Sequence, residues 1–276
     1  ALTRGCFVVG DVATLRRAQA LLGDPAGVSI PVALIDHPDE VPRLPPNCLP
    51  VFQAIAPPQG VVEGQVGAAA GKAAGDCVVW AARAALAGQV SAIVTAPLHK
   101  ESLAAAGFSY PGHTELLQAE AAAHLQRPIT EVPVRMMLAN DEMRTVLVSI
   151  HMSLRQAIEA VHVEGVLATI RIAHRALTAA LGRPPRIGVA GLNPHAGEGG
   201  LFGSEEQTII APAIAAARAE GIDVHGPYAP DTVFMRARST PAKAGEFDVV
   251  IAMYHDQGLI PVKYLGVDKG VNVTLG

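Results

Sequence analysis

Residues 186–200 read Arg186-Ile-Gly-Val-Ala-Gly-Leu-Asn-Pro-His-Ala-Gly-Glu-Gly-Gly200, a short apolar run followed by a glycine-rich loop. An alanine-rich stretch of helical character, Glu205–Glu220, comes next. A buried strand, a loop and then a helix form the repeating unit of α/β proteins. Short apolar runs followed by loops and helical stretches recur at Cys6–Val9, Ala92–Thr95, Thr145–Ile150 and Asp248–Met253. The sequence therefore predicts an α/β fold with a largely parallel sheet.

The segments between these runs predict helices and a division into domains. Helices are expected over the alanine-rich stretches Gly71–Ala87, Glu115–His124, Leu154–Leu181 and Glu205–Glu220. Six prolines between Val41 and Pro58 predict an irregular surface connection there. The turn-rich stretch Gly107-Phe-Ser-Tyr-Pro-Gly112 predicts a crossover between a first α/β domain, 1–107, and a second, 108–276, which contains His151, His195 and His255.

Composition excludes several classes of partner. The 276 residues carry a formal net charge of −4, with 21 basic and 25 acidic residues and no basic stripe, so nucleic acid is not expected as a partner. The longest apolar stretches, such as Phe247–Tyr254, are far shorter than the roughly 20 residues that cross a bilayer, so no membrane association is expected. The three widely spaced cysteines and the absence of an export signal predict reduced thiols in a cytoplasmic protein.

Three histidines each follow a predicted strand. His151 comes directly after Thr145–Ile150, His195 follows the strand that ends at Ala190, and His255 follows the run beginning at Asp248. Ligands of open α/β sheets bind at the carboxyl ends of the strands, where such side chains meet. Three imidazoles suit zinc, cobalt or nickel better than magnesium, and zinc is the first choice. The alternative is that each histidine is an ordinary polar residue at a strand end.

Other polar residues near predicted strand or helix ends are candidates for supporting roles. Asp231 and Asp256 are expected either as further ligands or acceptors that orient an imidazole, or as capping and turn residues. The segment Gly112-His-Thr-Glu115 begins a helix, whose free N–H groups favour an anion. Lys100 and Lys263 could hold a carboxylate or phosphate, or be solvated. The glycine loop is neither a P-loop nor the dinucleotide fingerprint G-x-G-x-x-G.

Several motifs together resemble the 4-hydroxythreonine-4-phosphate dehydrogenases of pyridoxal phosphate biosynthesis. They are Thr95-Ala-Pro-Leu-His-Lys100, Gly112-His-Thr-Glu115, Asn193-Pro-His-Ala-Gly-Glu-Gly-Gly200, Tyr254-His-Asp-Gln-Gly258 and Gly270-Val-Asn-Val-Thr-Leu-Gly276. The resemblance implies a two-domain α/β/α fold like that of isocitrate and isopropylmalate dehydrogenases, with an active-site cleft between the domains. It also implies a homodimer with the active site at the subunit interface.

The resemblance also assigns site residues and a reaction. It implies His151, His195 and His255 as metal ligands, and His113, Thr114, Lys263 and Asn272 as contacts to the phosphorylated hydroxy-acid substrate. The implied reaction transfers a hydride from the secondary alcohol of 4-phosphooxy-L-threonine to NAD or NADP. The β-keto acid formed loses carbon dioxide to give 3-amino-2-oxopropyl phosphate. The implied cofactor is a divalent metal, zinc before magnesium or cobalt, acting as a Lewis acid. No general acid or base is assigned.

Two departures and several alternatives accompany this interpretation. The family opens with a strand and a glycine-rich loop ahead of Cys6 and continues past Gly276 to return to the first domain, so both parts are expected to be missing. Relatives are expected to oxidise 4-phosphorylated four-carbon sugar acids or cyclic dihydrodiol carboxylates with the same metal triad. From other classes, a metal-dependent hydrolase or a non-catalytic metabolite-binding protein would use similar strand-end histidines.

Overall fold

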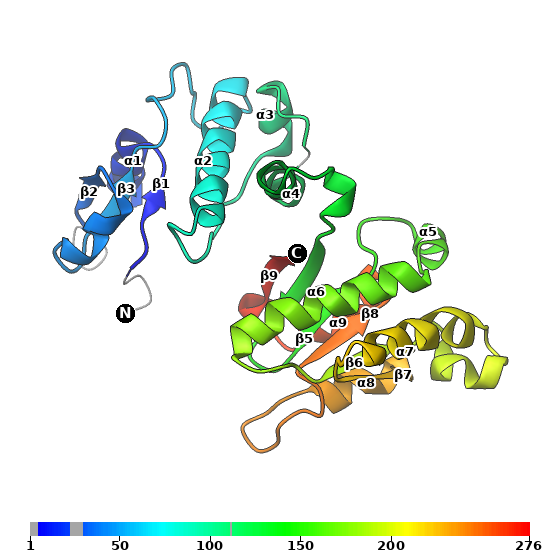
Figure 1. The fold of residues 1–276 in the computed structure, drawn as a ribbon. Helices are drawn as coiled ribbons and strands as arrows, with labels where there is room; N and C mark the ends of the chain where they lie inside the picture. The colour runs from blue at the N-terminus through cyan, green and yellow to red at the C-terminus, as the bar shows by residue number, and fades with distance from the viewer. Residues whose placement is uncertain (1–4, 23–29, 111) are drawn as a thin grey trace. The chain divides into compact units, whose positions relative to one another are not determined.

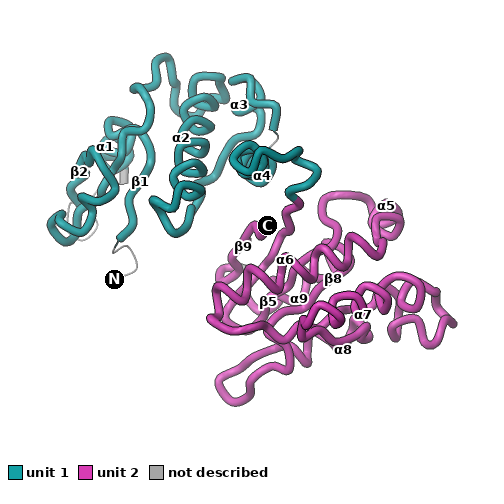
Figure 2. The backbone as a smooth tube through the Cα atoms, viewed as in Figure 1, with its two compact units in different colours: residues 1–132 teal, residues 133–276 magenta. Residues whose placement is uncertain are grey.

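The structure, a computed structural model, describes residues 5–22, 30–110 and 112–276. The chain divides into two compact units, Ala1–Val132 (unit 1) and Pro133–Gly276 (unit 2), as Figure 2 shows. The boundary expected after residue 107 therefore falls inside unit 1, and Pro111 in the expected crossover lies outside the described residues. The physical reason is that helix α4 (His113–Leu125) packs against α2 (Ala68–Leu86), where Arg83 and Glu120 form an ion pair of 2.8 Å.

Unit 1 contains a three-stranded parallel sheet in the order β1-β3-β2. Its strands are β1 (Val8–Val9), β2 (Val32–Ile35) and β3 (Leu49–Phe52), and its helices besides α2 and α4 are α1 (Val12–Leu22), α3 (Lys100–Ala105) and the 3-10 turns η1 (Pro38–Arg43) and η2 (Ile129–Glu131). An irregular connection was expected between Val41 and Pro58, and this is wrong where β3 lies. β3 is the central strand of the sheet, and its residue Val51 is fully buried. Only Pro50 of the six prolines lies inside the strand, where it removes a single N–H donor.

The strand expected at Ala92–Thr95 is also wrong. These residues are described, but they form no β pairing within the described part of the chain, and Val94 is 96% exposed. β-branched residues favour an extended backbone, yet a strand also needs a neighbour that accepts and donates its hydrogen bonds. Sequence pattern alone carries no information about that neighbour.

Unit 2 contains a six-stranded sheet in the order β7-β6-β8-β5-β4-β9. Figure 1 shows this sheet and labels every strand of it but β4. Its strands are β4 (Arg135–Ala139), β5 (Arg144–Leu147), β6 (Ile187–Ala190), β7 (Val224–Tyr228), β8 (Val249–Ala252) and β9 (Val271–Leu275). The four strands from β7 to β5 run parallel, whereas β4 is antiparallel to both of its neighbours. The predicted α/β class with a largely parallel sheet is confirmed.

Helices cover both faces of this sheet, so successive residues of β8 enter different cores. Val249 and Ile251 pack in the core under α6 (Val163–Leu181) and α7 (Ala211–Ala219). Val250 and Ala252 pack in the core under α8 (Pro230–Ala237) and α9 (His255–Tyr264). A strand buried on both faces must be apolar throughout, which explains why β6 and β8 were recognisable as continuous apolar runs.

Two of the expected helices are interrupted. The stretch Leu154–Leu181 forms α5 (Leu154–Glu159) and α6, because His162 caps α6 by accepting a hydrogen bond of 3.0 Å from the Gly165 N–H. The stretch after Glu205 opens with a π-helical turn, η4 (Glu206–Ile210), before α7. The remaining turns are η3 (Pro194–Gly200) and η5 (Val267–Lys269). No helix in the described ranges is long and apolar enough to span a membrane.

Candidate active site

His151 and His255 lie close together at one end of the unit 2 sheet. The parallel neighbours β5 and β8 continue their pairing past their last residues, since the Ser149 N–H donates to the Met253 carbonyl at 3.2 Å. His151 follows this pairing, and His255 is the first residue of α9. Their ring centroids are 5.5 Å apart, with planes inclined by 47°. The side chains of His151 and His255 therefore lie near each other, as expected of residues that follow neighbouring parallel strands.

The spacing of the two rings fits a shared metal ion. With Zn–N bonds of about 2.1 Å, two imidazoles on one tetrahedral ion have ring centroids roughly 5 Å apart. The Nδ1 of His255 lies 2.7 Å from a carboxylate oxygen of Asp256, the contact expected of a residue that orients a ligand. When Nδ1 donates to that carboxylate, Nε2 carries the lone pair that a metal needs.

His195 follows the strand next to β8 but stands apart from the pair. It is exposed in η3, and its ring lies 6.2 Å from that of Phe202. Because β6, β8 and β5 are adjacent in the sheet, the three histidines follow three neighbouring strands. Among the described residues, however, no three His, Cys, Asp or Glu side chains are grouped so that they could hold a metal ion. The structure therefore brings together two of the three expected ligands.

The backbone that carries His195 is left-handed. Residues 195–199 all have positive φ, and three of them are not glycine: His195 (51°), Ala196 (52°) and Glu198 (42°). The left-handed region costs a residue with a Cβ roughly 1–2 kcal/mol. Such a run persists only where neighbouring groups fix it.

The other expected residues of unit 2 are distributed around the sheet. Asp231 is exposed in the first turn of α8. Lys263 is exposed in the last turn of α9, and eight residues of helix place its Cα about 12 Å from that of His255 along the axis. Asn272 is exposed on the edge strand β9, opposite Leu138 of β4. None of these three is in a described contact with the histidine pair.

The expected substrate residues of unit 1 gather at the start of α4. His113 and Thr114 form its first turn after the cap residue Gly112. Burial lowers the pKa of His113, which favours the neutral imidazole. The side chain of Lys100, the first residue of α3, reaches the same place, because its Cε lies 4.0 Å from where a Cβ on Gly112 would be. A lysine beside a helix N-terminus suits an anionic group.

The family of this chain is shown by its sequence. The family described as "Pyridoxal phosphate biosynthetic protein PdxA" matches residues 3–276. The chain belongs to the PdxA family. It is 50% identical to the 4-hydroxythreonine-4-phosphate dehydrogenase of Beijerinckia indica subsp. indica, over 99% of the chain and 76% of the relative. It is 44% identical to the D-threonate 4-phosphate dehydrogenase of Salmonella typhimurium, over 98% of the chain and 77% of the relative.

Solved structures of PdxA-family proteins have the same fold. The crystal structure of the 4-hydroxythreonine-4-phosphate dehydrogenase from Klebsiella pneumoniae matches with a TM-score of 0.84 at 44% identity, covering 98% of this chain and 78% of that one. The resemblance and the α/β fold inferred from the motifs are therefore confirmed. As a member of the PdxA family with dehydrogenase relatives, the chain is an oxidoreductase.

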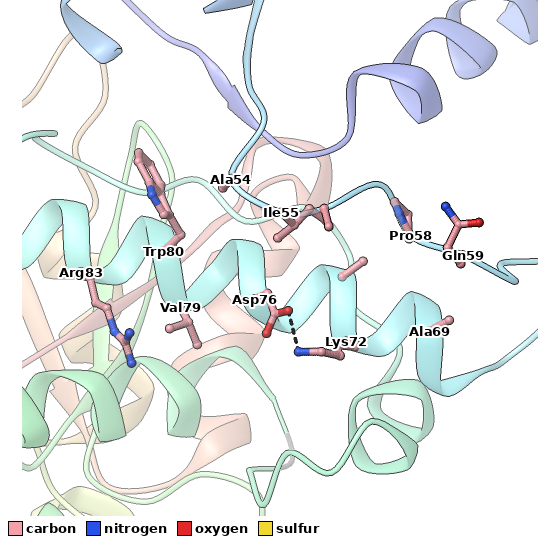
Figure 3. Close-up of a pocket in the computed structure, with 12 residues that line it drawn as sticks. Ala54, Ile55, Pro58, Gln59, Ala69, Lys72, Asp76, Val79, Trp80 and Arg83 are labelled. Carbon is pink, nitrogen blue, oxygen red and sulfur yellow. Dashed lines mark hydrogen bonds and ion pairs between the residues drawn. The ribbon is translucent and has the colours of Figure 1, made fainter. Parts of the chain in front are cut away.

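Unit 1 contains an open groove. It has a volume of about 620 Å³ and lies between α2 and the segment after β3, as Figure 3 shows. Lys72 and Asp76 pair across 2.8 Å on its α2 side, and Trp80 stacks on Phe52. None of the expected ligands or substrate contacts lines this groove. It therefore gives no support to the candidate site.

Two polar side chains near the histidines were missed by the sequence analysis. Glu206 falls within the helix expected over Glu205–Glu220 and no role was assigned to it, although it is only 3% exposed. Gln257 lies inside the motif Tyr254-His-Asp-Gln-Gly258, but no role was assigned to it. Only the folded loop shows what both side chains bind.

Proposed function

We propose that this chain catalyses the divalent-metal-dependent oxidation of 4-phosphooxy-L-threonine with NAD or NADP. The hydride of the secondary alcohol passes to the nicotinamide and the hydroxyl proton is released. The resulting β-keto acid loses carbon dioxide and gives 3-amino-2-oxopropyl phosphate. The observation that carries the proposal is the His151–His255 pair, with centroids 5.5 Å apart, in a PdxA-family chain 50% identical to a 4-hydroxythreonine-4-phosphate dehydrogenase.

In this proposal His151, His195 and His255 hold the metal, with zinc as the first choice and magnesium or cobalt as alternatives. Two imidazoles are already at a suitable spacing, and His195 is on the loop of the adjacent strand. The bound ion would supply Lewis-acid polarisation of the reacting oxygen. Asp256 would hold the His255 ring in place through Nδ1, leaving Nε2 for the metal, and Asp231 is the second candidate for such a role.

The proposed substrate contacts are His113, Thr114, Lys263 and Asn272. The first turn of α4 offers N–H groups to an anion, with the Lys100 side chain beside it. Lys263 supplies a flexible point charge, and Asn272 supplies an amide that can donate or accept. Together these groups suit a molecule that carries a carboxylate and a phosphate.

The same proposal includes a homodimer with its active site at the subunit interface and a cytoplasmic location. It rests on the family resemblance and on the three cysteines, which are all free. The formal charge of −4 and the absence of a basic stripe in the sequence argue against nucleic acid as a partner. The proposed partner is therefore a small anionic metabolite.

A second candidate substrate is D-threonate 4-phosphate, which the 44% identical relative from Salmonella typhimurium is named for. The two substrates share the carboxylate, the phosphate and the secondary alcohol, but carbon 2 bears an ammonium group in one and a hydroxyl in the other. An ammonium group can only donate, so the protein must offer it an acceptor. A hydroxyl can also accept, so the protein can offer it a donor instead. The metal triad is common to both and does not separate them.

Steady-state assays distinguish the two. Reduction of NAD and of NADP is followed by absorbance with each of the two phosphorylated acids. A higher kcat/KM for 4-phosphooxy-L-threonine supports the first assignment, and a higher value for D-threonate 4-phosphate supports the second. Turnover of neither substrate with either nicotinamide would reject both.

A further inference from the structure

A buried carboxylate holds the loop that carries His195. Glu206 lies at the start of η4 and is 3% exposed. Its Oε1 accepts hydrogen bonds from the N–H groups of Leu192 and Asn193, both at 2.7 Å. Its Oε2 accepts one from the Asn193 side-chain amide at 3.0 Å. Burial raises the pKa of Glu206, but these hydrogen bonds outweigh burial and leave the pKa below its usual value, so the carboxylate stays charged.

Glycines let the loop close around this carboxylate. A Cβ on Gly197 would lie 2.7 Å from Oε2 of Glu206, and one on Gly191 would lie 3.0 Å from Oε1. Side chains at these positions would push the backbone away from Glu206. The carboxylate therefore binds the chain just before the left-handed run, at Leu192 and Asn193, and lies close to Gly197 within the run.

Gln257 ties the same loop to the turn that carries His255. Its Oε1 accepts a hydrogen bond of 2.7 Å from the Met253 N–H, at the end of β8. Its Nε2 donates one of 2.8 Å to the carbonyl of Gly191, at the end of β6. Gln257 is two residues after His255, and Gly191 is four residues before His195. A single amide thus bridges the two segments that present these histidines.

We propose that Glu206 fixes the loop that presents His195 and that Gln257 fixes the turn that presents His255, each as a positioning residue for metal binding; this rests on the metal role in the proposed function. Neither side chain is a ligand. An apolar side chain in place of Glu206 would leave the N–H groups of Leu192 and Asn193 without this acceptor, so the carboxylate is what fixes this conformation of the loop. Residues that orient metal ligands influence how tightly a site binds its metal.

Two isosteric variants test the proposal. Glu206→Gln places an amide donor against the Asn193 donor, and Gln257→Glu keeps the acceptor for Met253 but sets a carboxylate against the Gly191 carbonyl. Zn²⁺ affinity is measured by competition with a chromophoric chelator. We expect each variant to bind Zn²⁺ about 10-fold more weakly, the lower end of the effect of residues that orient ligands, because neither side chain contacts an imidazole itself. Ile170→Val, a fully buried change in α6, controls for lost stability and should keep the wild-type affinity.

Wild-type Zn²⁺ affinity in both variants would overturn the proposal. An equal loss of affinity in Ile170→Val would also overturn it, because general destabilisation would then explain the effect. If the unmutated protein binds no Zn²⁺, the proposed metal site fails, and hydrogen exchange of amides 192–202 decides the positioning role by itself. Faster exchange there in Glu206→Gln supports the role, and unchanged exchange rejects it.

Discussion

The imidazole rings of His151 and His255 lie 5.5 Å apart, centroid to centroid, although they follow different strands of the sheet. The parallel pairing of β5 with β8 places them there, since both strands end at the same edge. The fold therefore brings two of the three proposed ligands together from backbone geometry alone. The third depends on a loop, and loops need further contacts to fix them.

His195→Ala is expected to lose bound metal and nearly all turnover while the fold stays intact, because the residue is exposed on a loop. Metal per chain is measured by elemental analysis, and folding by circular dichroism. His225→Ala, which removes an exposed histidine bonded to Asp223, serves as control and should keep both metal and turnover. Wild-type metal content in His195→Ala would remove His195 from the ligand set.

Asp256→Asn is expected to weaken metal binding about tenfold, because the carboxylate fixes the tautomer and orientation of the His255 ring. The chain offers a matched control in Asp223→Asn, since Asp223 bonds His225 at the same distance of 2.7 Å. Titration with Zn²⁺ compares the two variants. Equal affinities would show that the Asp256 contact has no influence on the metal.

Asp248→Asn is expected to destabilise unit 2 by about 1–3 kcal/mol near neutral pH, because it removes a charged acceptor. Burial raises the pKa of Asp248, but hydrogen bonds from Arg183 and Arg186 outweigh it, so the pKa lies well below its usual range. The carboxylate therefore stabilises the fold above its unfolded pKa of about 4. That contribution is lost as the pH falls further, through the folded pKa.

Urea unfolding of wild type and Asp248→Asn across pH 7 to 2 measures this dependence. The difference in the free energy of unfolding between wild type and Asp248→Asn should be largest at neutral pH and should shrink as the pH falls. Glu220→Gln, which disrupts an exposed pair with Arg171, should change little at any pH. A difference in the free energy of unfolding that stayed constant with pH would contradict the stabilising role of the charged Asp248 carboxylate.

Gly258→Ala is expected to cost about 1–3 kcal/mol by overpacking and to shift α9, whose first residue is His255. A Cβ there would lie 2.4 Å from Cδ2 of Leu147 and 2.9 Å from Cβ of Ala252, both fully buried. Thermal unfolding and Zn²⁺ affinity are measured together. Gly10→Ala, where the nearest atom would be 3.7 Å away, should leave both unchanged. A wild-type unfolding temperature and a wild-type Zn²⁺ affinity in Gly258→Ala would show that a Cβ at residue 258 affects neither stability nor the metal site.

Much of the unit 2 fold was readable in the sequence because burial on both faces leaves an unambiguous apolar run. β6 and β8 are buried at every position, and both were predicted to within a few residues. Edge strands carry weaker signals: β9, with most residues exposed, was not predicted as a strand. Ala92–Thr95 shows the opposite error, since its composition favours a strand but it has no pairing among the described residues.

The candidate site was predictable only where position along a strand determines position in space. His151 and His255 meet this condition, because each follows a parallel strand closely. Glu206 does not, because its burial arises only when residues 191–203 fold back over the helix start. Gln257 likewise gains its partner, Gly191, through the pairing of β6 with β8. Such tertiary contacts have no periodic signature in the sequence.

The most direct measurement is elemental analysis of the purified protein, paired with NAD and NADP reduction on 4-phosphooxy-L-threonine before and after chelation. The expected result is close to one divalent metal per subunit, with reduction that disappears on chelation and returns when Zn²⁺ is added. Reduction that persists in metal-free protein would contradict the proposed role of the histidines.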